Sequence, residues 1–307
     1  MSEERTPDAP GASAPQTWTL AHPERMEAAL YLCPTPIGNL GDITLRTLWV
    51  LSQAKVVLAE DTRRARVLLQ SYALKPPELL SYHKFNEASR CAEVVAHLRA
   101  GQSVALLSDA GTPLLADPGA RLVGAVLAEG LLVIPLPGAQ AVWPAVTASG
   151  LPALPVHVEG FLPRLKPARR RRLAALATLN DTLVFYEAPG RTVACLKDIE
   201  AVLGDRKACL AREITKRYET FWRGSVSELV GRIGAETVRG EVVLVVAGAE
   251  PTGESKEDLE QEVHALLAQG LSSRDIRAKL KEQGQSANEA YRAAARGRRD
   301  ETTKEPR

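Results

Sequence analysis

Three segments crowded with glycine, proline, aspartate and threonine follow stretches that have the composition of buried strands. They are residues 34–42, 108–119 and 135–139. Glycine lets a backbone approach a ligand closely, proline fixes a loop, and a helix that starts after the loop offers free N–H groups. Ordinary turns use the same residue types, and for residues 135–139 we favour that plainer interpretation. Two aspartates, two prolines and two glycines in residues 108–119 exceed what a turn requires, so this segment predicts a ligand site.

Other features of the sequence argue against several common sites. No G-x-G-x-x-G motif follows the first predicted strand and no G-x-x-x-x-G-K-[ST] motif occurs, which disfavours a dinucleotide-binding Rossmann site and a P-loop. The cysteines lie far apart, with neither a CxxC pair nor the histidine spacing of a zinc site. They are Cys33, Cys91, Cys195 and Cys209. We therefore expect no metal and no disulfide framework, and a cytoplasmic protein.

The composition is that of a folded protein. Of the 307 residues, 45% are hydrophobic and 25% are charged, which is enough to bury a core. The net charge of +2 is too small to indicate a nucleic-acid partner by itself. Residues 130–158 contain no Lys, Arg, Asp or Glu, but their prolines would leave backbone groups unpaired in lipid. We expect no membrane partner and no signal peptide.

Short apolar runs alternate with longer amphipathic ones along the chain, which predicts α/β domains. The first set of predicted strands comprises residues 29–33, 56–59, 79–82, 104–107 and 131–135, in a parallel sheet. The second set comprises residues 156–161, 182–186, 208–212, 219–222 and 241–246. Because residues 208–212 and 219–222 follow each other closely, we expect a hairpin and a mixed second sheet.

These elements divide the chain into four predicted parts. The parts are a disordered tail over residues 1–27, a first α/β domain over 28–149, a second α/β domain over 150–250, and a helical unit over 251–307. A helix over residues 138–149 closes the first domain. In the last part the Ser-x-x-acid spacing of a helix start recurs at Ser255, Ser272 and Ser286, and the last two helices resemble a helix-turn-helix.

Seven short motifs stand in a fixed order between residues 30 and 248. They are TPIGNLGDIT (35–44), AEDTR (59–63), SYH with NE (81–83, 86–87), SDAGTP with DPG (108–113, 117–119), EGFLP (159–163), FYE with P (185–187, 189) and REITK (212–216). Together they resemble the bacterial methyltransferases that modify the ribose 2′-hydroxyl of cytidine 1402 in 16S rRNA, within the tetrapyrrole-methylase superfamily. The chain departs from the usual pattern at Ala116, at Ala139 and Gln140, and at Gly190.

The resemblance implies a class III methyltransferase in which two α/β domains hold S-adenosylmethionine, folded, in the cleft between them. It also implies a homodimer and a 16S rRNA substrate, within the small ribosomal subunit. The positions that match the cofactor-binding parts of the family are Pro36, Gly38, Ser108, Asp109, Ala110, Gly111, Thr112, Pro113, Asp117, Pro118, Gly119, Pro137, Gly138, Tyr186, Ala188, Gly240 and Glu241.

Methyl transfer to a ribose hydroxyl is an in-line displacement at a sulfonium methyl group and needs no covalent enzyme intermediate. A base, or a cation that eases proton loss, would help a hydroxyl to react. The candidates from the shared motifs are His83, Asp61, Glu87, Glu187 and Lys216. His83 has the most suitable unperturbed pKa, although an ordinary loop histidine bonded to nearby backbone explains it equally well.

Basic residues cluster at three places and predict contacts to RNA phosphates. They are Arg63 and Arg64; Arg164, Lys166, Arg169, Arg170, Arg171 and Arg172; and Arg217. A solvated helix face is the ordinary alternative for such a run. Two rival functions stay open at this point: carbon methylation of a tetrapyrrole or small metabolite on the same scaffold, and a non-catalytic RNA-binding module associated with the ribosome.

Overall fold

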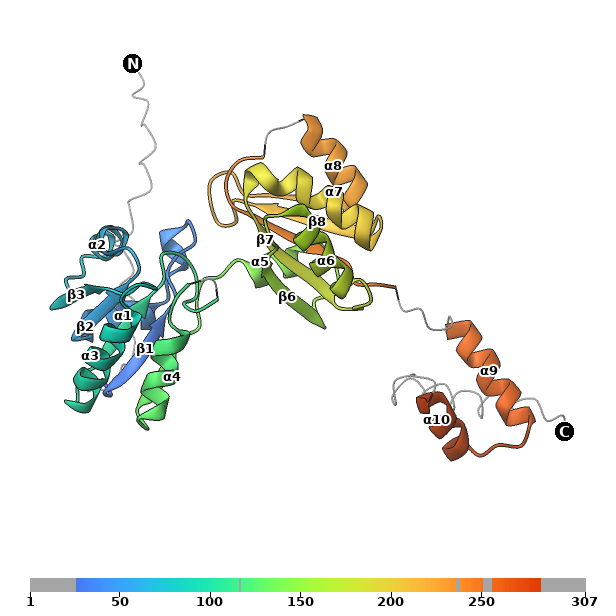
Figure 1. The fold of residues 1–307 in the computed structure, drawn as a ribbon, viewed down its shortest axis with the longest axis horizontal. Helices are drawn as coiled ribbons and strands as arrows, with labels where there is room; N and C mark the ends of the chain where they lie inside the picture. The colour runs from blue at the N-terminus through green and yellow to red at the C-terminus, as the bar shows by residue number, and fades with distance from the viewer. Residues whose placement is uncertain (1–25, 116, 236–237, 251–255, 283–307) are drawn as a thin grey trace, which may run out of the picture.

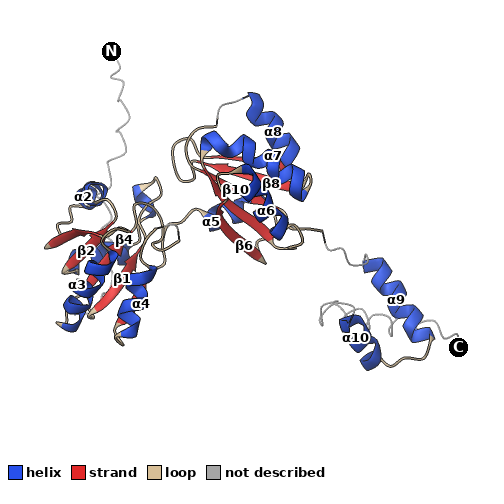
Figure 2. Cartoon of the chain, in the orientation of Figure 1, coloured by secondary structure: helices blue, strands red, loops and turns tan. Residues whose placement is uncertain are grey.

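Two five-stranded sheets with their helices form the body of the molecule, and a helical pair follows them (Figures 1 and 2). The structure is a computed structural model that describes residues 26–115, 117–235, 238–250 and 256–282. The predicted α/β class with two sheets is confirmed. The predicted tail falls almost wholly outside the described residues.

The first sheet is parallel throughout, in the order β3-β2-β4-β1-β5. Its strands are β1 (Ala29–Cys33), β2 (Val56–Ala59), β3 (Glu78–Ser81), β4 (Val104–Leu107) and β5 (Leu132–Pro135). The central strands β2 and β4, of sequence VVLA and VALL, are buried at every residue. Strands covered on both faces read as unbroken apolar runs, which is why the sequence revealed them.

Helices and a short 3-10 turn connect these strands and cover the first sheet. They are η1 (Leu40–Asp42), α1 (Leu45–Gln53), α2 (Thr62–Ser71), α3 (Glu87–Arg99) and α4 (Ala120–Ala128). Asp61 caps α2 by accepting the N–H of Arg63 at 2.9 Å. Because β1, β4 and β2 are neighbours, the loops that follow them meet at one edge of the sheet.

The second sheet is mixed, in the order β6-β7-β10-β8-β9, and only β6 and β7 pair in parallel. Its strands are β6 (Val156–Phe161), β7 (Thr182–Glu187), β8 (Lys207–Arg212), β9 (Thr220–Ser225) and β10 (Val242–Val246). Its helices are α6 (Lys166–Leu176), η2 (Pro189–Arg191), α7 (Thr192–Leu203) and α8 (Val226–Ala235). Strands β8 and β9 form the predicted hairpin.

Helix α5 (Val142–Ser149) belongs to the second sheet, although we expected a helix here to close the first domain. Its buried residues Val142, Ala145 and Val146 share one apolar cluster with β7, β8 and β10. A helix without charges suits this place because it covers an apolar sheet face. We therefore propose that the domain boundary precedes α5, and we call residues 26–141 the first lobe and residues 142–250 the second lobe.

The helical pair α9 (Lys256–Ala268) and α10 (Ser273–Glu282) has a small core of its own. The predicted start at Ser272 is present, since its Oγ accepts the N–H of Asp275 at 3.3 Å. The other two predicted helix starts, at Ser255 and Ser286, lie outside the described residues. Within the described ranges, no helix combines the length and hydropathy that crossing a bilayer requires. The uncharged segment 130–158 contains β5, α5 and the start of β6.

Candidate active site

The loops after β1 and β4 are joined into one frame. The N–H groups of Thr35 and Gly111 each donate to the other residue's carbonyl at 2.9 Å. Thr35 Oγ1 donates to the carbonyl of Ser108 at 3.1 Å, and Ser108 Oγ donates to that of Gly111 at 2.5 Å. Both hydroxyl-bearing residues are buried, so these bonds are shielded from water and hold the two loops in register.

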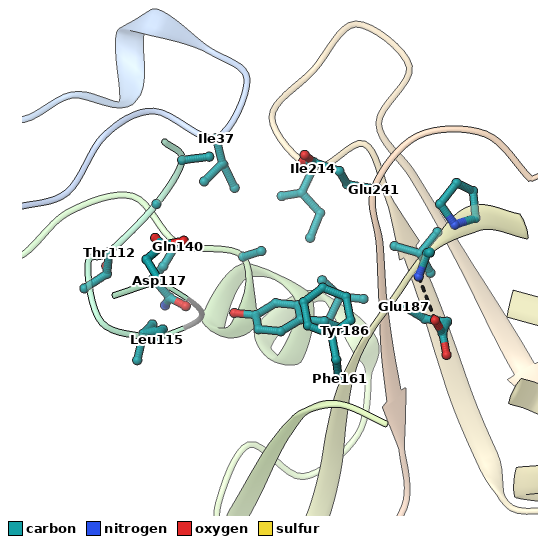
Figure 3. A pocket seen from close by; sticks show the side chains of 17 residues that line it. Ile37, Thr112, Leu115, Asp117, Gln140, Phe161, Tyr186, Glu187, Ile214 and Glu241 are labelled. Atoms are coloured by element: carbon teal, nitrogen blue, oxygen red, sulfur yellow. Dashed lines mark hydrogen bonds between the residues drawn. The ribbon is translucent and has the colours of Figure 1, made fainter. Parts of the chain in front are cut away.

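A cavity of about 420 Å³ lies between this frame and the second lobe. Figure 3 shows first-lobe side chains such as Ile37 and Asp117 facing Tyr186 and Ile214 of the second lobe across it. The lining residues are Ile37, Ala110, Gly111, Thr112, Leu115, Asp117, Gln140, Ala141, Phe161, Tyr186, Glu187, Ala188, Pro189, Ile214, Glu241, Val242 and Val243. Its size is that of a small-molecule site.

Aromatic and apolar side chains form one wall of the cavity, and a carboxylate lies opposite them. The rings of Phe161 and Tyr186 lie with their centroids 5.4 Å apart. Burial, aided by the charges of Glu60 and Asp109, raises the pKa of Asp117. Burial and the nearby Asp117 raise the pKa of Tyr186, whose hydroxyl points toward the Asp117 loop in Figure 3. This arrangement fits a ligand that has a flat ring and a positive charge.

The predicted cofactor contacts divide into three groups. Seven line the cavity: Ala110, Gly111, Thr112, Asp117, Tyr186, Ala188 and Glu241. Three line a second hollow, which is lined by the loops after β1 and β4 and by helix α2: Pro36, Ser108 and Asp109. Seven line neither space: Gly38, Pro113, Pro118, Gly119, Pro137, Gly138 and Gly240.

Two of the glycines in the last group serve close packing around Lys216. A Cβ at Gly38 would clash with the Lys216 side chain, and a Cβ at Gly240 would clash with Glu213. Lys216 Nζ donates to Glu213 Oε1 at 2.8 Å and to Glu241 Oε2 at 3.1 Å. Burial alone would lower the pKa of Lys216, but these two carboxylates outweigh it and raise the pKa. Lys216 therefore stays charged, and its stem packs against the first lobe at Gly38.

Two further candidate bases, Glu187 and Asp61, are each bound by an arginine. Glu187 lines the cavity, but Arg191 lies 3.0 Å from its carboxylate oxygens and the N–H of Ala188 donates to Oε1 at 2.8 Å. Asp61 lies at the second hollow, where hydrogen bonds from Arg63 hold its pKa well below the usual range. Both carboxylates are thus engaged in holding local structure.

His83 and Glu87 line neither space and lie beyond β3, the outer strand of the first sheet. The N–H of His83 donates to Asn86 Oδ1 at 2.8 Å, and Tyr82 Oη donates to Glu87 Oε1 at 3.2 Å. These bonds hold the backbone of His83 and the carboxylate of Glu87, while Nδ1 of His83 is buried without a hydrogen bond to a described residue.

The basic residues that we predicted as phosphate contacts differ sharply in accessibility. Arg169 is buried, and its Nε donates to Asp198 Oδ2 at 2.9 Å, so its guanidinium is not available to RNA. Arg170 and Arg172 are bound by Asp198 and Glu159. Three others are exposed, and no described residue forms an ion pair with them: Arg164, Lys166 and Arg171. Arg217 is also exposed and lies over the ring of Tyr218, and Arg63 and Arg64 line the second hollow.

Nine lining residues of the cavity were not predicted as contacts. Four of them, Ile37, Phe161, Pro189 and Ile214, lie inside the seven motifs, which gave a signal for them. The others carry no comparable signal: Leu115, Gln140, Ala141, Val242 and Val243. Apolar residues at strand ends look like core residues until the second lobe is placed opposite them.

A comparison with protein families decides the kinship of the chain. The family model "Tetrapyrrole (Corrin/Porphyrin) Methylases" matches residues 29–230, which covers nearly all of the first lobe and most of the second. The chain belongs to the tetrapyrrole methylase family. The cavity between the lobes is therefore the candidate active site of a methyltransferase, and the expected kinship is confirmed.

Within the tetrapyrrole methylases, the chain is similar to several curated proteins named "Ribosomal RNA small subunit methyltransferase I". The relative from Micromonospora olivasterospora is 48% identical over 263 residues, 84% of this chain and 83% of the relative. The relative from Bacillus subtilis is 43% identical, over 72% of this chain and 75% of the relative. That from Escherichia coli O157:H7 is 42% identical, over 80% and 85%.

Solved structures of tetrapyrrole methylases share the fold. The cobalamin biosynthetic enzyme cobalt precorrin-4 methyltransferase is 20% identical, with a TM-score of 0.54 over 72% of this chain and 95% of that one. The methyltransferase CobJ is 18% identical, with a TM-score of 0.54 over 73% and 97%. At these identities the likeness concerns the fold alone.

Proposed function

We propose that this tetrapyrrole methylase transfers a methyl group from S-adenosylmethionine to ribosomal RNA, at the ribose 2′-hydroxyl of cytidine 1402 of 16S rRNA. The observation that carries the proposal is the 42–48% identity to rRNA small subunit methyltransferases over most of the chain. The tetrapyrrole enzymes of the same fold are far less similar in sequence. The small ribosomal subunit, in the cytoplasm, is the proposed setting.

The residues of the cavity fit S-adenosylmethionine, which supplies an electrophilic methyl group on a sulfonium when it is bound. Phe161 and Tyr186 offer a stacking face for an adenine and a negative ring face for a cation. The Asp117 carboxylate opposite them complements a positive charge. The backbone of residues 110–112, held by the bridge to Thr35, offers polar groups at a fixed position.

The contribution of this chain to the reaction is mainly alignment. Two reactants that are held in line can gain roughly 7–11 kcal/mol relative to free encounter. The bridge between Thr35 and Gly111 holds the first lobe's wall, and the Lys216 side chain, packed on Gly38, links that wall to the second lobe. The apolar residues Ile37, Ile214 and Val243 exclude water between the two walls.

Labelling tests the proposal. Small ribosomal subunits from a strain that lacks the enzyme are incubated with the protein and with S-adenosylmethionine labelled in its methyl group. We expect label in 16S rRNA, at one linkage that resists alkaline cleavage, because a 2′-O-methyl group removes the nucleophile of that cleavage. Label that enters a tetrapyrrole acceptor, but not the RNA, would contradict the proposal.

We also propose a homodimer as the active form. Large apolar side chains are exposed on α5 and on the chain around β6: Trp143 (47% exposed), Leu154 (75%) and Val158 (48%). A mass near 66 kDa in solution, about twice the 33.1 kDa of one chain, is expected by light scattering. A mass of one chain, for the active protein, would contradict this assembly.

A further inference from the structure

A second hollow, of about 600 Å³, opens beside the cavity and belongs wholly to the first lobe. One wall is the loop after β1, with Pro36 and Leu40, and the other is α2, with Arg64 and Val67. Asp109, on the loop after β4, also lines the hollow. The hollow therefore spans the carboxyl ends of β1, β4 and β2, where open α/β sheets bind ligands.

Hydrogen bonds fix the walls of this hollow before any ligand arrives. Tyr72 Oη, just after α2, donates to the carbonyl of Leu40 at 2.5 Å and so ties the two walls together. The N–H of Asp61, which caps α2, donates to Asp109 Oδ1 at 3.2 Å. The space is thus a built feature of the lobe and not a gap between mobile loops.

The lining combines two guanidinium groups with apolar surface. The side chains of Arg63 and Arg64 are 86% and 71% exposed, and they pair with Asp61 at 2.8 Å and Asp109 at 3.4 Å. Such exposed pairs are weak, so either guanidinium can turn to a phosphate. Together with the exposed apolar side chains of this hollow, they suit a ligand with an anionic group and a flat, weakly polar ring, as in a nucleotide.

The hollow and the cavity share one short segment. Ser108 and Asp109 line the hollow, and the next three residues, 110–112, line the cavity. Residues of the two spaces also interact electrostatically, because the charge of Asp109, in the hollow, contributes to the raised pKa of Asp117, in the cavity. A group beside Ser108 and Asp109 in the hollow is therefore close to whatever the cavity holds.

We infer that this hollow receives the acceptor nucleotide of the RNA strand, with Arg63 and Arg64 on its phosphate and its ribose directed toward residues 108–112. The inference rests on the proposed function and deepens it: the donor lies between the lobes, and the acceptor lies in the first lobe. The loop that the Thr35–Gly111 bridge holds borders both spaces, and the ribose 2′-oxygen would meet the methyl carbon at its edge.

The first test is charge removal at the rim with a control on the same helix. Arg64→Gln removes a guanidinium that lines the hollow, whereas Arg66→Gln makes the same change at an exposed residue of α2 that does not line it. We expect Arg64→Gln to weaken binding of a labelled RNA of the cytidine-1402 region by about tenfold and to reduce the salt slope by about one. Arg66→Gln should leave both within about twofold of wild type.

The second test fills the space. Val67→Trp places a large ring at the hollow, whereas Leu127→Trp makes a similar change at an exposed site on α4 away from both spaces. We expect Val67→Trp to raise the KM for small subunits at least about tenfold, with unchanged affinity for S-adenosylhomocysteine by calorimetry. Leu127→Trp should match wild type in both measurements.

The outcomes separate the inference from the proposed function. Suppose that wild type labels 16S rRNA and that Val67→Trp has a normal thermal midpoint. If this variant then labels the RNA with a wild-type KM, the inference is overturned and the proposed function stands. If wild type binds the cofactor but labels no RNA, the proposed function fails and takes the inference with it. A raised KM in Val67→Trp alone, together with weaker RNA binding in Arg64→Gln alone, supports the inference.

Discussion

Three of the four arginines of helix α6 are bound by carboxylates, whereas Arg63 and Arg64 at the start of helix α2 line the second hollow. In α6, Arg169 is 5% exposed and shares Asp198 with Arg170, while Arg172 is bound by Glu159. In α2, both guanidiniums are mostly in water. Three of the six basic residues in the denser run are therefore bound by acids, and Arg164, Lys166 and Arg171 are the members that form no ion pair with a described residue. A run of arginines in the sequence says nothing of the acids that fold against it.

The largest effect is expected from the buried pair that joins Arg169 of α6 to Asp198 of α7. Asp198→Ala leaves Arg169 as a buried charge without its partner, which should cost about 3–5 kcal/mol of unfolding free energy. Urea unfolding measures the loss, and Arg171→Ala, at an exposed site on α6, should change stability by less than about 0.5 kcal/mol. Equal effects of the two variants would contradict the structural role of the pair between Arg169 and Asp198.

A smaller effect, dependent on pH, is expected at Glu159. The hydrogen bond from Arg172, aided by His157, holds the pKa of Glu159 below its usual range. A lowered carboxyl pKa stabilises the fold above the ordinary pKa, and this contribution is lost as the pH falls. Glu159→Gln should therefore cost about 1 kcal/mol at pH 7, with a difference from wild type that shrinks toward pH 3. A difference that grows in acid would exclude this assignment.

Salt dependence of RNA binding sharpens the comparison within α6 itself. Arg171 is exposed and no described residue forms an ion pair with it, whereas Arg172 is held by Glu159. We expect Arg171→Gln to reduce the slope of log K against log salt by about one, and Arg172→Gln to leave it unchanged. A slope that responds equally to both changes would mean that the Glu159 pair opens to RNA.

The smallest effect on stability is expected at the rim of the hollow. Arg64→Gln breaks an exposed ion pair with Asp109, and such pairs contribute about 0–1 kcal/mol. The unfolding free energy should fall by less than about 0.5 kcal/mol, while RNA binding suffers. A large loss of stability in this variant would mean that Arg64 has a structural role, like Arg169 of α6.

The strands were predictable from the sequence because most are buried runs with an unambiguous pattern. The first sheet agrees with prediction to within one residue at each strand end, and β1, β2 and β4 agree completely. The hairpin of β8 and β9 followed from the shortness of the segment between them. These features depend on the composition of short segments, which can be read directly from the sequence.

Features that depend on distant partners were not predictable. Helix α5 was expected beside the first sheet, and only the apolar face of the second sheet explains its place. The partners of the α6 arginines lie 28 or 29 residues away at Asp198 and 13 residues away at Glu159. The cavity was half predictable, because the loop 108–119 is conspicuous while Val242 and Val243 read as an ordinary strand.

The account depends most on the cavity between the two lobes as the site of the methyl donor. A crystal structure of the protein grown with S-adenosylhomocysteine tests this directly. We predict density for the ligand between residues 110–117 of the first lobe and Tyr186, Ala188 and Glu241 of the second. Density for the ligand at any other place, or an empty cavity at a saturating concentration, would contradict the account.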